Sequence, residues 1–297
     1  MPRSARPALV ALLFALAAAP HCARAEGAPA ADALAEADRL WTERSLEATG
    51  GEAVPARVEA LVAGCRKAVA LDPESLEPRW RLMRALYFQG EHVAASAEVK
   101  KLVFEEGKKA GEEALGIVRR RVAGATGRKT EKESPVQLAP AAKEIPGVVP
   151  SFLWAAVDWG KWALVFGKTA AARQGAADRI RDYAAAVVLL DPSFESGAGY
   201  RVLGRLHHQT PAIPFFTMWA SRDEALKYLR LSVTAGPTHF YNRLYLAEAL
   251  WDYEKDKRSE ARRMLEELVA APPSSDYLVE DRRAQEDARA LLSRWAK

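Results

Sequence analysis

Few side chains in this 297-residue chain could do chemistry, since it has only five histidines and two cysteines. His207 and His208 are adjacent, so on a helix they would point about 100° apart and could not bind one metal ion together. Acidic neighbours such as Glu266 and Glu267 are typical of a solvated helix face. The sequence has no phosphate-binding loop, nucleophile elbow, paired-cysteine motif or dinucleotide fingerprint. These patterns predict a protein that is not an enzyme, with no cofactor and no bound metal.

Tryptophans form the first of two candidate sites. If Val148–Lys168 is a helix, Trp154, Trp159 and Trp162 fall within an arc of about 140° at the helical spacing. Apolar residues also cover the opposite side of this segment. A helix that is apolar all round is typical of a buried position.

Two interpretations of the tryptophans remain open. They either pack in the core or line an apolar pocket or channel, where each indole buries a large area and keeps one N–H for a polar contact. In the second interpretation Phe166, Tyr200 and His207 complete the ligand-binding set. Asp158 and Lys161 lie three residues apart and can pair across one turn. They interrupt the apolar run enough to exclude a membrane span.

The second candidate site is the segment 209–220, an apolar and proline-rich loop between two halves of a helical repeat. It either folds back on the core or is exposed to a partner, a second subunit or a ligand, because long loops in compact domains are often functional. Exposed apolar patches also mark contact sites. We assign the pocket mouth or partner contact to Pro214, Phe215, Phe216 and Trp219.

The repeat around this loop follows the tetratricopeptide pattern of aromatic, small and proline positions. Proline-punctuated helix ends recur along the chain, and Pro237 and Pro273 are 36 residues apart, close to one period of 34. The chain is rich in Ala and Leu and poor in β-branched residues. The sequence therefore predicts an all-α, tetratricopeptide-like helical repeat array, in which neighbouring pairs share a core. The matching positions are Tyr200, Leu203, Gly204, His207, Ala225, Leu229 and Pro237.

Residues 1–25 are predicted to be a secretory signal peptide. Two arginines precede the short apolar run Ala8–Ala19, and Ala23–Ala25 is a small-x-small cleavage site. The apolar run is too short to span a membrane. Cys22 offers the alternative of a lipoprotein, but the residues before it form a poor acylation motif. The segment predicts a periplasmic location.

Cleavage after Ala25 leaves 40 of the 43 basic residues against 39 acidic ones. A near-neutral chain without a dense basic and aromatic patch is not expected to bind nucleic acid. Cys65 is then left without an internal disulfide partner, so we expect a buried, inert thiol. Residues 26–297 are predicted to form one domain, with a flexible linker or insertion at 124–147 and a terminal capping helix at 278–296.

Several segments resemble the TatT family, the tetratricopeptide T-component associated with TRAP transporters. The resemblance is dense over about 150–270 and weaker over 35–110. It implies a periplasmic homotrimer whose subunits each contain an apolar pore, and which cooperates with a TRAP-type solute-binding protein. The segments that carry it are Trp154, Gly160–Ala163, Tyr200–His207, Pro214–Phe216, Ser221–Leu226 and Asn242–Leu250.

The expected function is that of a periplasmic accessory component of a TRAP-type system. It would bind an apolar small ligand in a pore or pocket and dock a solute-binding protein. The alternative is an interaction scaffold for envelope assembly, which would bind peptides in the repeat groove and no small ligand.

Overall fold

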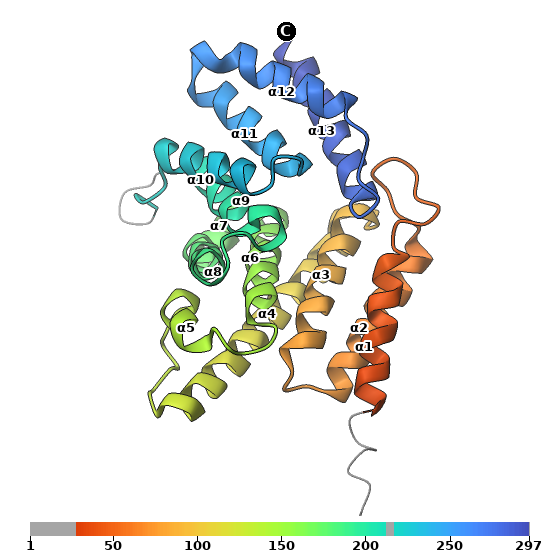
Figure 1. Cartoon of the computed structure of the whole chain (residues 1–297), viewed down its shortest axis with the longest axis vertical. Coiled ribbons are helices and arrows are strands. Elements are labelled where there is room, and N and C mark those ends of the chain that lie inside the picture. Colours follow the sequence, from red (N-terminus) through yellow and green to blue (C-terminus); the bar gives the residue numbers. More distant parts are fainter. Residues whose placement is uncertain (1–27, 212–216, 297) are drawn as a thin grey trace, which may run out of the picture.

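The computed structural model describes residues 28–211 and 217–296, and this part of the chain is all-α (Figure 1). The predicted fold class, a helical repeat array, is confirmed. The predicted signal peptide and Cys22 lie outside the described residues. The helices are α1 (Ala28–Thr42), α2 (Pro55–Leu71), α3 (Leu76–His92), α4 (Ala97–Thr126), α5 (Pro135–Ala142), α6 (Val148–Phe166), α7 (Lys168–Arg173), α8 (Ala176–Leu190), α9 (Phe194–Gln209), α10 (Arg222–Ala235), α11 (Phe240–Tyr253), α12 (Arg258–Ala270) and α13 (Leu278–Trp295).

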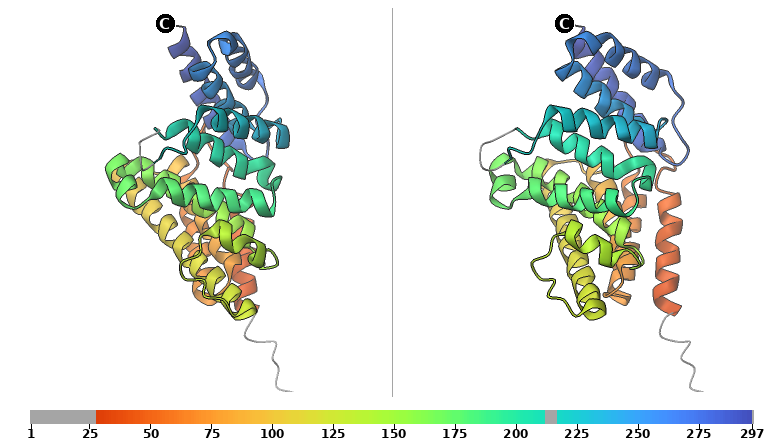
Figure 2. Two further views of the ribbon diagram at one scale, coloured as in Figure 1. Left: turned by 90° about the vertical axis from the view of Figure 1, so that its left-hand side faces the viewer. Right: turned by 60° about the vertical axis from the view of Figure 1, so that its left-hand side comes forward.

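Most of these helices belong to two layers. In the first layer α3 contacts α6, α6 contacts α9, α9 contacts α11 and α11 contacts α13. The second layer consists of α2, α4, α8, α10 and α12, each packed between its chain neighbours. Figure 2 shows the pairs stacked along the long axis of the molecule. This is the arrangement in which repeats bury the apolar stripe that none could bury alone.

A glycine lets two of these helices approach closely. Gly204 on α9 faces Leu229 on α10, and a Cβ atom at Gly204 would lie 2.6 Å from Leu229 Cγ. Any larger side chain would therefore push the pair apart. This explains physically why the repeat pattern has a small residue after Leu203.

The interior consists of one large core and smaller ones. The largest joins α4, α5, α6 and α8, and a second joins α10 to α13. Cys65 on α2 lies in a smaller N-terminal core. Burial raises the pKa of its thiol to about 12, so the thiolate is suppressed, as expected for an inert cysteine.

The two ends of the array contact each other. The start of α13 lies beside the loop between α1 and α2 (Figure 1). Arg44 and Glu280 form a buried ion pair at 2.9 Å, with side chains 5% and 10% exposed. The backbone N–H of Gly51 donates to Glu286 at 2.9 Å, and Arg282 donates to the carbonyl of Ala48. The C-terminal helix predicted at 278–296 therefore closes the array as well as covering its last pair.

The segment 124–147 differs from the predicted flexible linker. Helix α4 continues to Thr126, and α5 occupies Pro135–Ala142. Ser134 and Gln137 form a reciprocal capping box, and Leu138 is fully buried against the large core. The prolines mark helix starts and turns here rather than an unstructured segment, because proline is well tolerated in the first turn of a helix.

A left-handed turn interrupts the start of α9. Glu195, Ser196 and Gly197 have φ values of 43°, 59° and 74°. Residues with side chains rarely adopt this conformation, so the turn needs support from its surroundings. The side-chain amide of Asn242 supplies it, donating to the carbonyls of Ser196, at 2.9 Å, and of Gly236, at 3.0 Å.

The buried ion pair between Arg44 and Glu280 gives a first testable prediction. Glu280→Gln should lower the free energy of unfolding by about 3 kcal/mol, because it leaves the buried Arg44 without its countercharge. Urea denaturation followed by circular dichroism measures this change. Glu74→Gln is the control, since its ion pair with Arg120 lies on the exposed surface and should contribute nothing measurable. Equal effects of the two substitutions would contradict a stabilising role for the closure.

Candidate ligand-binding surface

All three predicted pocket tryptophans lie in the largest core. Trp159 and Trp162 are almost fully buried, and their rings meet edge to face with centroids 5.5 Å apart. Phe166, at the end of α6, stacks on Trp162 at 4.7 Å. The Lys108 ammonium lies over both indoles, 5.2 Å from the Trp159 centroid and 4.6 Å from that of Trp162. This is the contact pattern expected of core packing between α4 and α6.

Trp154 lies apart from that pair. Its ring packs against that of Tyr87 on α3, with the two centroids 5.4 Å apart. The structure therefore does not bring the three tryptophans together as one wall. Of the three, Trp154 is the one beside the half-buried residues described below.

Tyr200 and His207 face α10. Tyr200 stacks on Tyr228 at 6.3 Å, and the His207 ring meets Tyr228 at 5.8 Å. His207 Nδ1 also accepts a hydrogen bond from the backbone N–H of Ser221 at 3.2 Å. These contacts hold the two halves of the interrupted repeat together.

Trp219 fixes the end of the apolar loop to the helical array. Its indole N–H donates to Asp178 on α8 at 3.0 Å, and its ring packs edge-on against His207. Met218, next to it, is 70% exposed. The described end of the loop thus folds back on the array. Pro214, Phe215 and Phe216, the remaining predicted contact residues, lie outside the described residues.

Asp158 does not pair with Lys161 as expected. Lys161 instead pairs with Glu91 on α3 at 2.5 Å. Asp158 is fully buried against Gly107 of α4, and neither of its carboxylate oxygens has a hydrogen-bond partner. Burial raises the pKa of Asp158 well above its ordinary range, although the Lys161 charge acts in the opposite direction. Burial therefore favours the neutral form of this carboxyl group in the folded protein.

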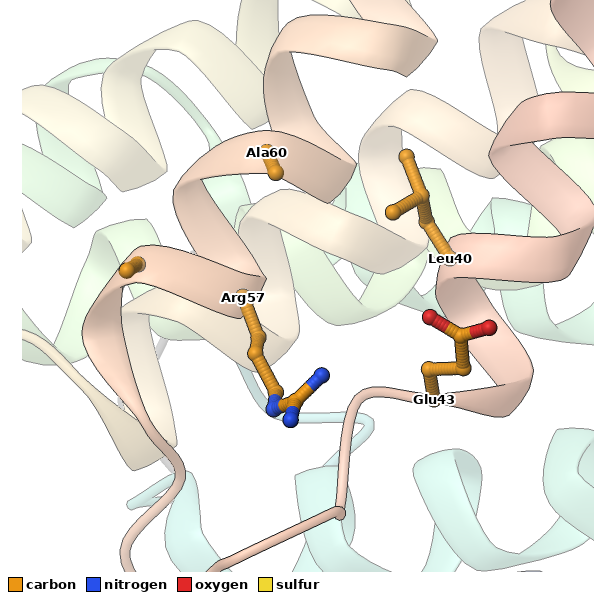
Figure 3. Close-up of a pocket in the computed structure, with 5 residues that line it drawn as sticks. Leu40, Glu43, Arg57 and Ala60 are labelled. Carbon is orange, nitrogen blue, oxygen red and sulfur yellow. The ribbon is translucent and has the colours of Figure 1, made fainter.

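Two shallow pockets lie on the surface, and neither is lined by a predicted site residue. The first lies between α1 and α2, where Leu40 and Glu43 face Arg57 and Ala60 (Figure 3). The second lies between the start of α3 and the C-terminal half of α4, and its lining includes Arg79 and Glu113. Both are bordered by ion-paired side chains, and they offer no convergent chemistry.

Half-buried aromatic and charged side chains gather instead on the first layer of helices. We call this set the inner surface. Lys161 connects α6 to α3, since its ammonium pairs with Glu91 and lies 5.5 Å from the Tyr87 centroid. The inner surface consists of the half-buried Tyr87 and Glu91 on α3, Lys161 on α6, Arg201 and Arg205 on α9, and Tyr241, Tyr245 and Glu248 on α11, together with the exposed Asp287 on α13.

Side chains of α9 and α11 on the inner surface also contact one another. Arg205 pairs with Glu248 at 2.6 Å, and its guanidinium lies 4.4 Å from the Tyr245 centroid. Tyr241 and Tyr245 approach each other at 5.4 Å, one turn apart on α11. Cations, carboxylates and phenol rings therefore alternate along this surface.

Charges from distant helices act on one another across the inner surface. Burial raises the pKa of Asp287 on α13, while the positive charge of Lys161 on α6 lowers it. Burial also raises the pKa of Tyr241 on α11, and Glu91 on α3 adds to the rise. The charges of Lys161 and Glu91 thus act on groups of α11 and α13. Tyr241 is half-buried, whereas Asp287 is exposed.

The sequence contains a signal for this surface that is separate from the tryptophan pattern. Arg201 and Arg205, and Tyr241 and Tyr245, are each four residues apart, which places each pair on one helix face. Both pairs lie on the first helix of a repeat. Polar and aromatic residues at these positions, where the repeat needs no core residue, would have pointed to the inner surface.

No family model matches the chain, and no curated protein matches its sequence. Within residues 28–211 and 217–296, no helix is long and apolar enough to cross a lipid bilayer. The same residues include no group of three or more histidine, cysteine or acidic side chains placed to hold a metal ion.

The buried acid gives a second prediction. Asp158→Asn should remove a pH dependence of stability, because the raised pKa of Asp158 favours folding at low pH and this contribution is lost as the pH rises. Above about pH 4, wild type should lose up to about 1.4 kcal/mol per pH unit relative to the variant. Denaturation of both proteins at pH 5, 6.5 and 8 measures the difference. A constant difference over this range would contradict a raised pKa of Asp158.

Proposed function

We propose that the protein is a non-enzymatic binding component that holds a small molecule on its inner surface. The observation that carries this proposal is the inner surface itself, where rings and charges from five helices face one another. Its chemistry is suited to an amphipathic molecule, since tyrosine rings bury apolar area while Arg, Lys and Glu bind polar groups. No nucleophile with an adjacent base is needed for such a role.

The apolar ligand expected from the sequence changes accordingly. Trp159 and Trp162, the expected lining of its pocket, pack in the core. Tyr87, Tyr241 and Tyr245 take their place in the proposal. A ligand with a polar group matches this surface better than one that is apolar throughout.

The proposed context is a TRAP-type transport system in the periplasm, in which the protein docks a solute-binding protein. This part rests on the family resemblance and on the predicted signal peptide. Exposed large apolar side chains support a docking role, since such residues often mark contact sites. The most exposed are Leu102 at 74%, Met218 at 70% and Leu164 at 69%. The resemblance also leads us to propose a homotrimer.

The scaffold alternative requires a groove that a peptide can enter along its length. The contact between α13 and the α1–α2 loop joins the two ends of the array. This closure favours an enclosed small molecule over an extended peptide. A peptide-binding scaffold is therefore the outcome that the following test would reveal if our proposal is wrong.

Native mass spectrometry of residues 26–297, released gently and then stripped, tests the proposal. We expect a trimer that carries a small, removable mass. A monomer without any bound small molecule would contradict both the ligand and the oligomer, and would favour the scaffold.

A third prediction separates the inner surface from the core. Tyr245→Ala should lower the retained small-molecule mass while leaving the melting temperature nearly unchanged, because Tyr245 is half-buried. Trp162→Ala should instead lower stability by about 3–5 kcal/mol, as expected for a buried aromatic side chain. Tyr200→Ala is the matched control, because Tyr200 is also half-buried but stacks on Tyr228, away from the inner surface. Equal ligand loss in Tyr200→Ala and Tyr245→Ala would contradict the assignment.

A further inference from the structure

Gly51, in the loop between α1 and α2, is hydrogen-bonded to two other helices through its backbone groups. Its N–H donates to Glu286 on α13 at 2.9 Å, and its carbonyl lies 3.0 Å from Nδ1 of His92, the last residue of α3. The carbonyl of His92 in turn accepts from the N–H of Ala53 at 3.0 Å. His92 therefore takes part in the contact that joins the two ends of the array.

The loop and α13 are packed closely at this point. A Cβ atom at Gly51 would lie 2.9 Å from the Cα atom of Arg283, which belongs to the backbone of α13. The buried pair of Arg44 and Glu280 connects the same loop to the same helix. Because the loop has so little room to shift, a change at His92 that displaces Gly51 must also disturb the bonds to α13.

One ring nitrogen of His92 has no partner. A carbonyl oxygen can only accept, so Nδ1 carries the proton and donates to Gly51, while Nε2 is the unprotonated nitrogen of a neutral ring. Nε2 is buried without a hydrogen-bond partner, and the residue is 2% exposed. The ring packs on Phe88, with centroids 4.7 Å apart, and Phe88 belongs to an apolar cluster with Val58 and Val279. A proton added at Nε2 would create a buried charge and a donor without an acceptor, which is costly.

Charged groups on three helices act on His92 without offsetting its burial. Glu280 on α13 and Glu91 on α3 favour the protonated ring, as does the bond to Gly51, whereas Lys161 on α6 opposes it. Burial is the largest effect, and it lowers the pKa of His92 below its ordinary value. The neutral ring therefore contributes stability that is fully present above pH 6.5, about the pKa of an exposed histidine, and is lost as the pH falls below it.

We propose that His92 is an acid-sensitive latch, which holds the α1–α2 loop against α13 while its ring is neutral and releases the loop when the ring is protonated. The two largest cores include no residue of this loop, so they can stay packed when the contact opens. Acidification would then separate the two ends of the array and leave its helices folded. This inference goes beyond the proposed function and does not require a bound ligand.

Hydrogen exchange of residues 26–297, measured by mass spectrometry at pH 7.5 and 5.0, tests the latch. His92→Asn is the reference variant, because its amide can donate to Gly51 in place of Nδ1 but takes up no proton in this range. The ratio of wild-type to variant exchange rates at one pH is free of the pH dependence of exchange itself. In peptides 46–54 and 279–287 we expect this ratio to rise about ten- to thirtyfold on acidification, since an exposed histidine has a pKa of about 6.5.

Two controls separate the latch from other acid effects. Burial raises the pKa of Asp281 on α13 to about 6, so its protonation on acidification favours the folded form, a change of opposite sign. Both proteins carry Asp281, and its contribution cancels in the ratio. Peptides from α8, which does not contact the loop or α13, should show a constant ratio. Circular dichroism at both pH values establishes that each protein is folded.

Titration of the His92 ring by nuclear magnetic resonance tests the wild type directly, with the resonance assigned by its absence in His92→Gln. We expect a pKa below about 6.5, and this measurement decides the matter if His92→Asn does not fold. A pKa of about 6.5 or higher would overturn the inference. So would an exchange ratio that is the same at both pH values, or one that rises equally in α8, because the whole chain would then be opening.

Discussion

The contact between the two ends of the array determines what the rest of the structure can do. A helical repeat stack is held mainly by interactions between neighbours, so its ends are normally independent of each other. Here Arg44, in the first loop, is bonded to Glu280, on the last helix, across 236 positions of sequence. A buried ion pair of this kind needs accurate geometry to offset its desolvation. The closure therefore fixes the spacing of the helices between the two ends, and with it the shape of the inner surface.

Aromatic residues have two distinct roles in this array. Trp159 and Trp162 pack between α4 and α6 and give the largest core its bulk. Tyr87, Tyr241 and Tyr245 remain half-buried beside charged groups. A tyrosine can keep its hydroxyl hydrated while its ring is covered, whereas two interlocked indoles exclude water. This difference in chemistry separates the residues that build the fold from those to which we assign the proposed binding role.

Local patterns in the sequence predicted the repeat and its helix pairing. Gly204, a small residue, and Pro237, which follows a helix end, are determined by steric requirements that act over a few residues. Helix α5 was missed because its prolines resemble linker punctuation, while its burial depends on α8, far along the chain. The pairing of Lys161 with Glu91 was missed for the same reason, since the partner within one turn, Asp158, is turned toward α4. The inner surface depends on which helices face each other. The packing of the whole array determines this, so local sequence patterns do not predict it.

Asn242 connects the architecture of the array to its proposed chemistry. One amide group supports the carbonyl of Ser196, before the body of α9, and that of Gly236, after α10, while its oxygen orients Arg201. The left-handed turn, the junction between two repeats and a cation of the inner surface thus share a single side chain. Any movement of Arg201 must strain or relax this junction, because the asparagine cannot release one partner without affecting the others. The position of the Arg201 side chain and the geometry of the repeat are consequently coupled.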